Sequence, residues 1–273
     1  MYRQFSFQRA WSLASFELIR LFFTRRGALA LAAFVTVWGF ILYYPVSSAA
    51  AMVSSESFKG MATSLFGSFG LSELLTWRAP ELAIYWLVAV CFFPLFTLYA
   101  ASDQTCADRS RGTLRFISLR ASRTEILLGR FFGQALILFL LMLVTLLAVL
   151  AMAVYRDSGV LLDSSLKGLA LLKELVIAVL PFIALMSFFN SFIRSARLAI
   201  VACLLFYGFM LIFVGIIESW FAPFSVLNYL LPGIQLRGVI NQQGADMGLY
   251  LIPLGQTLGY LLAGDVIMRR SRL

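Results

Sequence analysis

Long apolar stretches alternate with short polar segments along most of the chain. A hydrocarbon core about 30 Å thick is crossed by roughly 20 helical residues, which rise about 1.5 Å each. Six stretches reach this length, and none carries a charged residue in its apolar core. They predict six transmembrane helices, over residues 27–46, 81–102, 131–154, 175–193, 198–217 and 249–267. We therefore expect an all-α membrane protein that forms a single transmembrane domain over residues 1–273.

The overall composition agrees with this pattern. Hydrophobic residues make up 61% of the chain and charged residues 13%, whereas soluble domains carry about 25% charged residues. These proportions exclude a soluble globular enzyme, a disordered chain and a disulfide scaffold. In a membrane protein, a net charge of +9 gives no reason to expect nucleic-acid binding. What matters is how the charges are divided between the two sides of the membrane.

The charges divide unequally between the two sides of the predicted membrane. Sixteen of the 22 Lys and Arg residues and five of the 13 Asp and Glu residues fall on one side, a net charge of +11, which leaves −2 on the other. Because loops rich in Lys and Arg stay in the cytoplasm, we predict that both termini are cytoplasmic.

Residues 5–24 precede the first span and form a separate amphipathic element. Trp11 and Phe22 fall on one helical stripe, with Glu17 and Arg20 largely off it. This pattern predicts an elbow helix at the cytoplasmic membrane surface. The helix either anchors the chain only or also touches a cytosolic partner.

Residues 218–248 join the last two spans and contain two prolines within an aromatic cluster, including Trp220, Pro223, Tyr229 and Pro232. This composition predicts re-entrant, broken helices that dip back into the outer leaflet. Such a backbone persists at depth only against protein or a water-filled cavity. The alternative is ordinary packing at the membrane surface.

Several chemistry-bearing motifs are missing from the sequence. There is no GxxxxGK[ST] loop and no GxGxxG, so the chain lacks the usual glycine loops that hold nucleotide phosphates. It has no histidine, and Cys91, Cys106 and Cys203 lie far apart, which gives no support to a metal or redox site. We expect a chain that is not itself an enzyme and holds no cofactor.

The most polar stretch, residues 102–130, is predicted to be cytoplasmic. Ser122 and Glu125 have the spacing of a capping box, which predicts that the third helix starts well before its apolar core. Residues 104–118 predict a short helix that carries Asp108, Arg109, Arg111 and Arg115, with Leu114, Phe116 and Ile117 as apolar contacts. A helix of this kind suits docking of a partner. The alternative is that its arginines only enforce topology.

This stretch resembles the permease subunits of type 2 ABC transporters. The shared features are residues 108–114 (DRSRGTL), residues 122–130 (SRTEILLGR) and Asp103 upstream. The family typically has Glu where this chain has Asp108, and a proline often precedes its Ser-Arg pair, where this chain has Leu119-Arg120-Ala121. The N-terminal segment resembles the elbow helix of the family, through Glu17, Arg20, Arg25 and Arg26.

The resemblance implies a transporter whose energy comes from elsewhere. A cytosolic ABC ATPase dimer would bind ATP and Mg, and a homodimer of this chain would sit in the bacterial inner membrane among its lipids. The residues that would couple to the ATPase are Asp103, Asp108, Arg109, Arg111, Gly112, Thr113, Leu114, Arg115 and Arg123. Asp108, Arg109 and Arg111 would make charged contacts with the ATPase surface.

The cargo is constrained only by the apolar spans. They favour export of a hydrophobic or amphiphilic molecule, or transfer of ATPase motion to a periplasmic or extracellular accessory protein. The polar residues within spans, Gln134, Asn190, Tyr207 and Gln256, are expected to join helices more often than to bind cargo. An ATP-independent secondary carrier or a membrane-embedded enzyme is the alternative.

Small-residue pairs mark close helix contacts. Gly208 and Gly215 share one face of the fifth predicted span, and Gly129 and Gly133 have the small-xxx-small spacing. The resemblance implies dimerisation through the first and fifth spans. Packing within one subunit is the expected use of such pairs.

Overall fold

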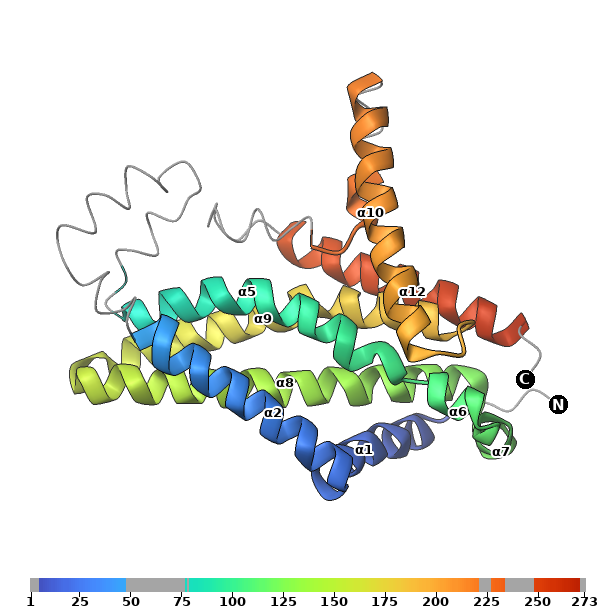
Figure 1. Cartoon of the computed structure of the whole chain (residues 1–273), viewed down its shortest axis with the longest axis horizontal. Coiled ribbons are helices and arrows are strands. Elements are labelled where there is room, and N and C mark those ends of the chain that lie inside the picture. The colour runs from blue at the N-terminus through green and yellow to red at the C-terminus, as the bar shows by residue number, and fades with distance from the viewer. Residues whose placement is uncertain (1–4, 48–76, 78, 221–226, 234–247, 271–273) are drawn as a thin grey trace.

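The computed structural model describes residues 5–47, 77, 79–220, 227–233 and 248–270, and its elements in these ranges are helical (Figure 1). The long helices are α1 (Phe7–Phe23), α2 (Arg25–Ile41), α5 (Pro80–Ala100), α8 (Arg123–Arg156), α9 (Leu161–Asn190), α10 (Ala196–Trp220) and α12 (Gly248–Arg270). Shorter elements are η1 (Leu42–Val46), η4 (Ala101–Asp103), α6 (Cys106–Ser110), α7 (Thr113–Arg120) and η5 (Ser158–Val160).

The six predicted spans are confirmed, because six of the described helices are long and apolar enough to cross a membrane. Their limits differ from the apolar stretches in two places, since α8 begins at Arg123 and α9 at Leu161. The start of α9 continues before its apolar core because it packs against the later turns of α8, whereas the start of α8 packs against α1. A Cβ on Gly168 of α9 would lie 3.3 Å from a methyl group of Leu146 on α8.

The centre of the bundle is formed by α5, α8 and α9. The hydroxyl group of Tyr85 on α5 lies 3.1 Å from the hydroxyl group of Thr145 on α8, and both residues are buried. α2 joins this core through Trp38, whose ring centroid lies 5.7 Å from that of Tyr85 and 5.3 Å from that of Phe93. Aromatic packing therefore fixes the first span on the second.

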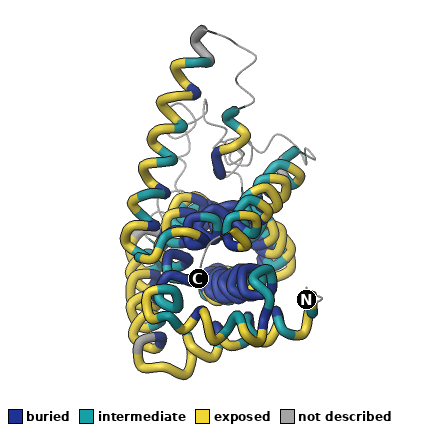
Figure 2. Tube along the Cα trace, turned by 90° about the vertical axis from the view of Figure 1, so that its right-hand side faces the viewer, coloured by how far each residue is buried: buried dark blue, intermediate teal, exposed yellow. Residues whose placement is uncertain are grey.

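Helix α10 stands away from the rest of the bundle (Figure 1). Its projecting length is largely exposed, in contrast to the buried centre of the bundle (Figure 2). Only 11% of the most apolar part of α10 is buried inside the chain. Contacts with α9 hold the first half of α10, through the rings of Phe206 and Phe189, whose centroids are 5.8 Å apart. An apolar helix this exposed requires lipid or another protein around it.

Two expectations outside the spans have different outcomes. Residues 104–118 form two helices, α6 and α7, rather than one, because Gly112 between them has a φ of 72°. A left-handed residue ends a helix, and glycine adopts this conformation readily. Most of the predicted re-entrant stretch, 218–248, lies outside the described residues, although 227–233 are described.

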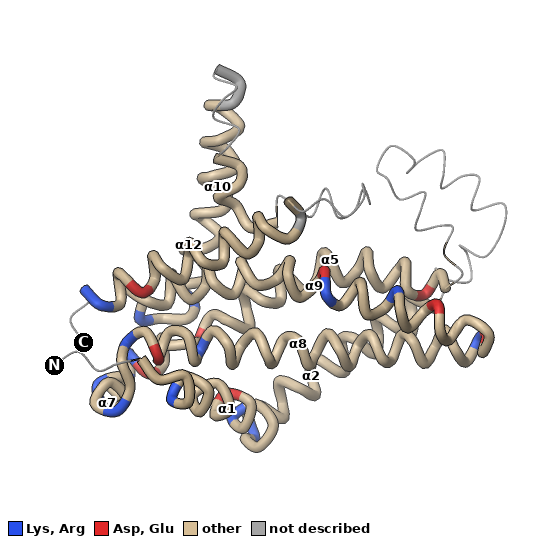
Figure 3. Tube along the Cα trace, turned by 180° about the vertical axis from the view of Figure 1, so that it is seen from behind, with Lys and Arg blue, Asp and Glu red and all other residues tan. Residues whose placement is uncertain are grey.

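Charged residues are most frequent at the end of the bundle formed by α7 and the last turns of α12, and a smaller group lies at the opposite end (Figure 3). We call the first of these the arginine-rich end. It comprises α1, α6, α7, the start of α8 and the end of α12. The middle of α8 carries no charge from residue 131 to residue 155.

A charged junction as the candidate functional site

The start of α8 is fixed by the predicted capping box. The Glu125 main-chain N–H donates to Oγ of Ser122 at 3.3 Å, and the Ser122 N–H donates to Oε2 of Glu125 at 2.7 Å. These two bonds satisfy amides that have no partner within the helix. The prediction that the third span begins before its apolar core is therefore confirmed.

Glu125 also holds the start of α1 against α8. Its Oε1 accepts from the main-chain N–H of Ser6 at 2.7 Å and lies 2.9 Å from Nη2 of Arg9. Glu125 is fully buried, so this carboxylate serves two helices at once. The sequence identified the cap but not this second role.

Two glycines bring α1 into close contact with α8. A Cβ on Gly129 would lie 2.8 Å from the carbonyl oxygen of Ala10, and one on Gly133 would lie 3.1 Å from that of Ala14. This small-residue pair therefore packs within the chain, as expected.

The face of α1 that packs on α8 holds Ala10, Ala14 and Glu17, which are buried. Trp11 and Phe22, on the predicted apolar stripe, remain exposed. The side of α1 that carries Glu17 thus meets protein, and the aromatic stripe is left for another environment.

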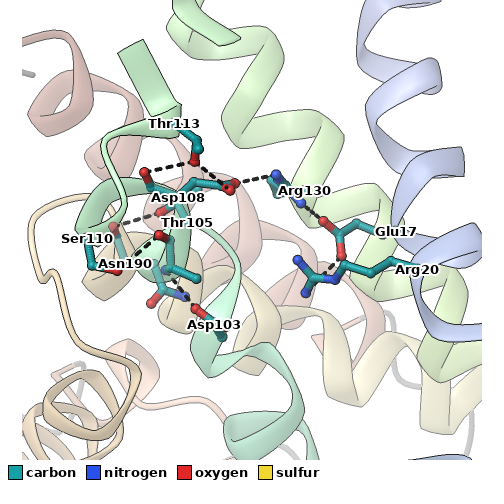
Figure 4. Close-up of polar contacts among 10 residues, drawn as sticks. Glu17, Arg20, Asp103, Thr105, Asp108, Ser110, Thr113, Arg130 and Asn190 are labelled. Carbon is teal, nitrogen blue, oxygen red and sulfur yellow. Dashed lines mark hydrogen bonds and ion pairs between the residues drawn. The ribbon is translucent and has the colours of Figure 1, made fainter. Parts of the chain in front are cut away.

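Arg130 of α8 lies at the centre of the arginine-rich end and is only 3% exposed. Its guanidinium group forms ion pairs with Glu17 of α1 and with Asp108 of α6 (Figure 4). Glu17 is also 3.2 Å from Nη2 of Arg20, one turn further along α1. Arg130 thus connects the N-terminal helix, the loop helices and the third span, and we call Glu17, Arg130 and Asp108 the charged junction.

Local hydrogen bonds shape the loop that carries Asp108. Asp103 accepts from the main-chain N–H of Ala107 at 2.8 Å, at the start of α6. The Thr113 hydroxyl donates to Oδ1 of Asp108 at 3.2 Å, across the turn at Gly112. The Asp108 carboxylate therefore contacts Thr113 at the start of α7 through one oxygen and Arg130 through the other.

The same loop is tied to the end of α9 by buried polar contacts. Asn190 donates to the carbonyl oxygen of Ala101 at 2.8 Å, and its side-chain oxygen accepts from the Cys106 thiol at 2.9 Å. The Thr105 hydroxyl donates to the Asn190 carbonyl at 2.9 Å. Asn190 therefore joins helices, which is the use expected for a polar residue within a span.

Helix α12 closes the other side of this end. Nη1 of Arg123 donates to the carbonyl oxygens of Met268 at 2.6 Å and Arg269 at 2.9 Å. The Thr124 hydroxyl donates to Asp265 at 2.8 Å. Positive charge on Arg123 suits these carbonyls because they lie at the C-terminal end of a helix.

The two faces of α7 differ sharply. Leu114 is buried in a small cluster with Ile126, Leu127 and Met268. On the opposite face, Phe116 is 72% exposed and Leu119 is 70% exposed, between the exposed residues Arg115 and Arg120. The buried leucine fixes the helix on the bundle, and the other face presents two large apolar side chains at an otherwise polar end.

The predicted coupling residues fall into three groups. Those whose side chains are engaged within the chain are Asp103, Asp108, Arg109, Thr113, Leu114 and Arg123. Arg111 and Arg115 are exposed, and Gly112 forms the turn. Of the three residues expected to make charged contacts with a partner, Asp108 and Arg109 are thus bound internally, and Arg111 is on the surface.

The predicted elbow residues also separate. Glu17 and Arg20 belong to the charged network of α1, while Arg25 is exposed at the start of α2. The Arg26 side chain lies outside what the structure describes. Sequence reasoning did not assign Arg130 a role. The available signal was an arginine within an apolar run, since a buried charge needs a partner.

These features define a multi-pass, all-helical membrane protein whose loop helices and N-terminal helix meet on one buried arginine. The family model described as ABC-2 family transporter protein matches residues 11–266, so the chain belongs to the ABC-2 transporter family. No match is found among curated proteins. Membership implies a membrane subunit of an ABC transporter, with ATP hydrolysis in a separate subunit.

Proposed function

We propose that this chain is the permease of an ATP-driven exporter and that the exposed face of α7 docks on a cytosolic ABC ATPase. The observation that carries the proposal is the pair Phe116 and Leu119, which stand exposed on a helix whose opposite face is anchored by Leu114. Large apolar side chains ringed by arginines are typical of interface centres. The arginine-rich end would face the cytoplasm.

The charged junction gives a route by which docking would act on the membrane helices. A displacement of α6 and α7 reaches Arg130 through Asp108, and reaches α1 through Glu17. Arg130 belongs to α8, which runs on as the third span. ATP binding by the partner would favour one of two packings, provided that its binding energy differs between them.

Replacing Phe116 and Leu119 together with aspartate tests the docking. We expect loss of ATPase copurification with the tagged chain, because truncating or charging the centre of an interface typically weakens binding by about 2 kcal/mol or more, roughly 30-fold. The measurement is the amount of ATP-hydrolysing subunit that copurifies from membranes.

Tyr155→Asp is the matched control, since Tyr155 is 95% exposed at the opposite end of α8. It is expected to copurify the ATPase normally. Equal copurification by the α7 variant would remove α7 as the docking surface. A chain that moves cargo without any ATPase would overturn the proposal and favour a secondary carrier.

A second copy of this chain would cover α10. Gly208 and Gly215 lie on this exposed helix, and a Cβ on either would meet no atom within 4 Å. Their small size would let a second helix approach closely. The proposed assembly is a homodimer of this chain with two ATPase subunits, and the open space beside these glycines supports it.

Cysteine at Gly208 or Gly215 is expected to form a disulfide between two copies in oxidised membranes. The measurement is a band of twice the monomer mass that reducing agent removes. Cysteine at Leu169, an exposed position on α9, serves as the control and is expected to give no such band. Absence of cross-linking at both glycines would contradict dimerisation through α10.

The apolar spans support a hydrophobic or amphiphilic cargo, or mechanical action on an extracytoplasmic accessory protein. The partner would bind ATP and Mg, and the chain would lie in the bacterial inner membrane with both termini in the cytoplasm. ATP-dependent movement of a lipid-like probe in vesicles containing both subunits would support a cargo path. ATPase activity that responds only to an added accessory protein would support mechanical action.

A further inference from the structure

Four successive main-chain carbonyls in the segment 227–233 accept hydrogen bonds from side chains of two spans. Nε2 of Gln256 on α12 donates to the carbonyl oxygens of Tyr229 at 2.6 Å and Leu231 at 3.0 Å. The Tyr260 hydroxyl, also on α12, donates to the Leu230 carbonyl. The Tyr207 hydroxyl on α10 donates to the Pro232 carbonyl. We call residues 227–233 the strap.

The donors lie deep along their helices. Gln256 and Tyr260 are eight and twelve residues past the start of α12 at Gly248, which corresponds to about 12 and 18 Å along the helix axis. Residues 227–230 form a single 3-10 turn. Carbonyls outside a continuous helix have no water to bond at this depth in a membrane, so such a segment persists there only where protein satisfies them. The side chains of Gln256, Tyr260 and Tyr207 meet this requirement residue by residue.

The strap also bears on how α10 is held. Near the middle of α10, the Tyr207 ring stacks with Phe182 of α9 at a centroid distance of 6.5 Å. The Tyr207 hydroxyl then reaches the strap, which Gln256 and Tyr260 bind from α12. The strap therefore links α10, the least buried span, to α12.

We propose that Gln256, Tyr260 and Tyr207 are positioning residues that clamp the strap by its carbonyls and so tie the fifth span to the sixth. This use differs from ordinary interhelical bonding, because the acceptors are successive carbonyls of an intervening segment rather than groups on a facing helix. The proposal concerns the membrane part alone and does not depend on the identity of an ATPase.

Removing the donors while keeping side-chain size tests the clamp. The variants are Tyr260→Phe, Tyr207→Phe and Gln256→Leu, and the probe is deuterium uptake by main-chain amides in lipid nanodiscs, read by mass spectrometry. We expect peptides that cover 227–233 to exchange about tenfold faster in Gln256→Leu combined with Tyr260→Phe, since local opening governs exchange. Gln256→Asn keeps a carboxamide donor and is expected to exchange more slowly than Gln256→Leu.

Two controls separate the clamp from general loosening. Tyr99→Phe removes a hydroxyl from an exposed tyrosine on α5 and is expected to leave exchange of the strap unchanged. Peptides from residues 182–190 of α9, which are almost wholly buried, are expected to keep their protection in every variant. Unchanged exchange of the strap after loss of the donors, or equal acceleration in α9, would overturn the proposal.

Discussion

Replacing Arg130 with alanine is expected to lower the free energy of unfolding by about 3–5 kcal/mol, because it leaves the buried carboxylate of Glu17 without its main counter-charge. Glu17 retains only Arg20, whose side chain is 43% exposed. Asp108 loses the contact that holds α6 against α8. The measurement is unfolding of the purified chain in mixed micelles, compared with the unchanged protein.

A neutral version of the charged junction separates its effect on stability from its proposed role in passing motion from α6 and α7 to the spans. Combining Glu17→Met, Arg130→Met and Asp108→Asn removes all three charges, and replacing a buried ion pair by apolar residues of similar volume is often close to neutral in stability. This variant is expected to unfold like the parent, to retain its ATPase and to lose ATP-driven transport. Stability as low as that of Arg130→Ala would show that the charges themselves are needed for folding, and full transport would show that they do not transmit motion.

Gly129→Ala is expected to displace α1 from α8. The added Cβ would lie 2.7 Å from Cβ of Leu13 and 2.8 Å from the Ala10 carbonyl oxygen. The second contact is with main chain, so the helices must separate. Overpacking of this kind typically costs about 1–3 kcal/mol. The loss is measured by unfolding in micelles, and release of α1 by faster proteolysis near its N-terminus.

Gly255→Ala is the matched control, because a Cβ on this glycine of α12 meets no atom within 4 Å. It is expected to match or slightly exceed the parent in stability, since alanine favours a helix. If Gly129→Ala behaved like this control, the close packing of α1 on α8 would be wrong, and with it the route from the charged junction to the N-terminal helix.

The spans and the start of α8 were predictable because their signals are local and redundant. About 20 uncharged apolar residues in a row admit few structures other than a transmembrane helix. At the start of α8, Ser122 and Glu125 accept hydrogen bonds from each other's main-chain N–H groups, so this signal is contained in four residues. The limits of α9 were less predictable. Its turns before residue 175 carry Asp163, Lys167 and Lys173 and pack alongside α8, a contact that the hydropathy of α9 does not encode.

The charged junction was harder to foresee because it is tertiary. Asp108 was singled out in the sequence and Arg130 was not, and their pairing joins residues of α6 and α8 that lie 22 positions apart. Glu17 lies off the aromatic stripe of α1, and periodicity alone predicted a helix at the membrane surface without indicating which part of the protein its other face would meet. Gly129 and Gly133 make the contact with α8 possible, because a small-residue surface lets α8 approach Ala10 and Ala14.

The polar residues within spans show a similar limit. Tyr207 and Gln256 were recognisable as unusual, and their expected use was to join helices. Their acceptors lie in the strap between α10 and α12, more than 20 residues away in sequence. Tyr260 likewise donates to a strap carbonyl 30 residues away in sequence, so no pattern within α12 predicts its role.

The most direct test of the central claim is a photo-crosslinking amino acid placed at Phe116 in the membrane of the native cell. We predict a cross-linked product that contains an ATP-binding subunit together with this chain, and no such product from the same probe at Tyr155. A probe at Phe116 that yields only lipid adducts or adducts within the chain would contradict the account, because α7 would then not be the surface on which the ATPase acts.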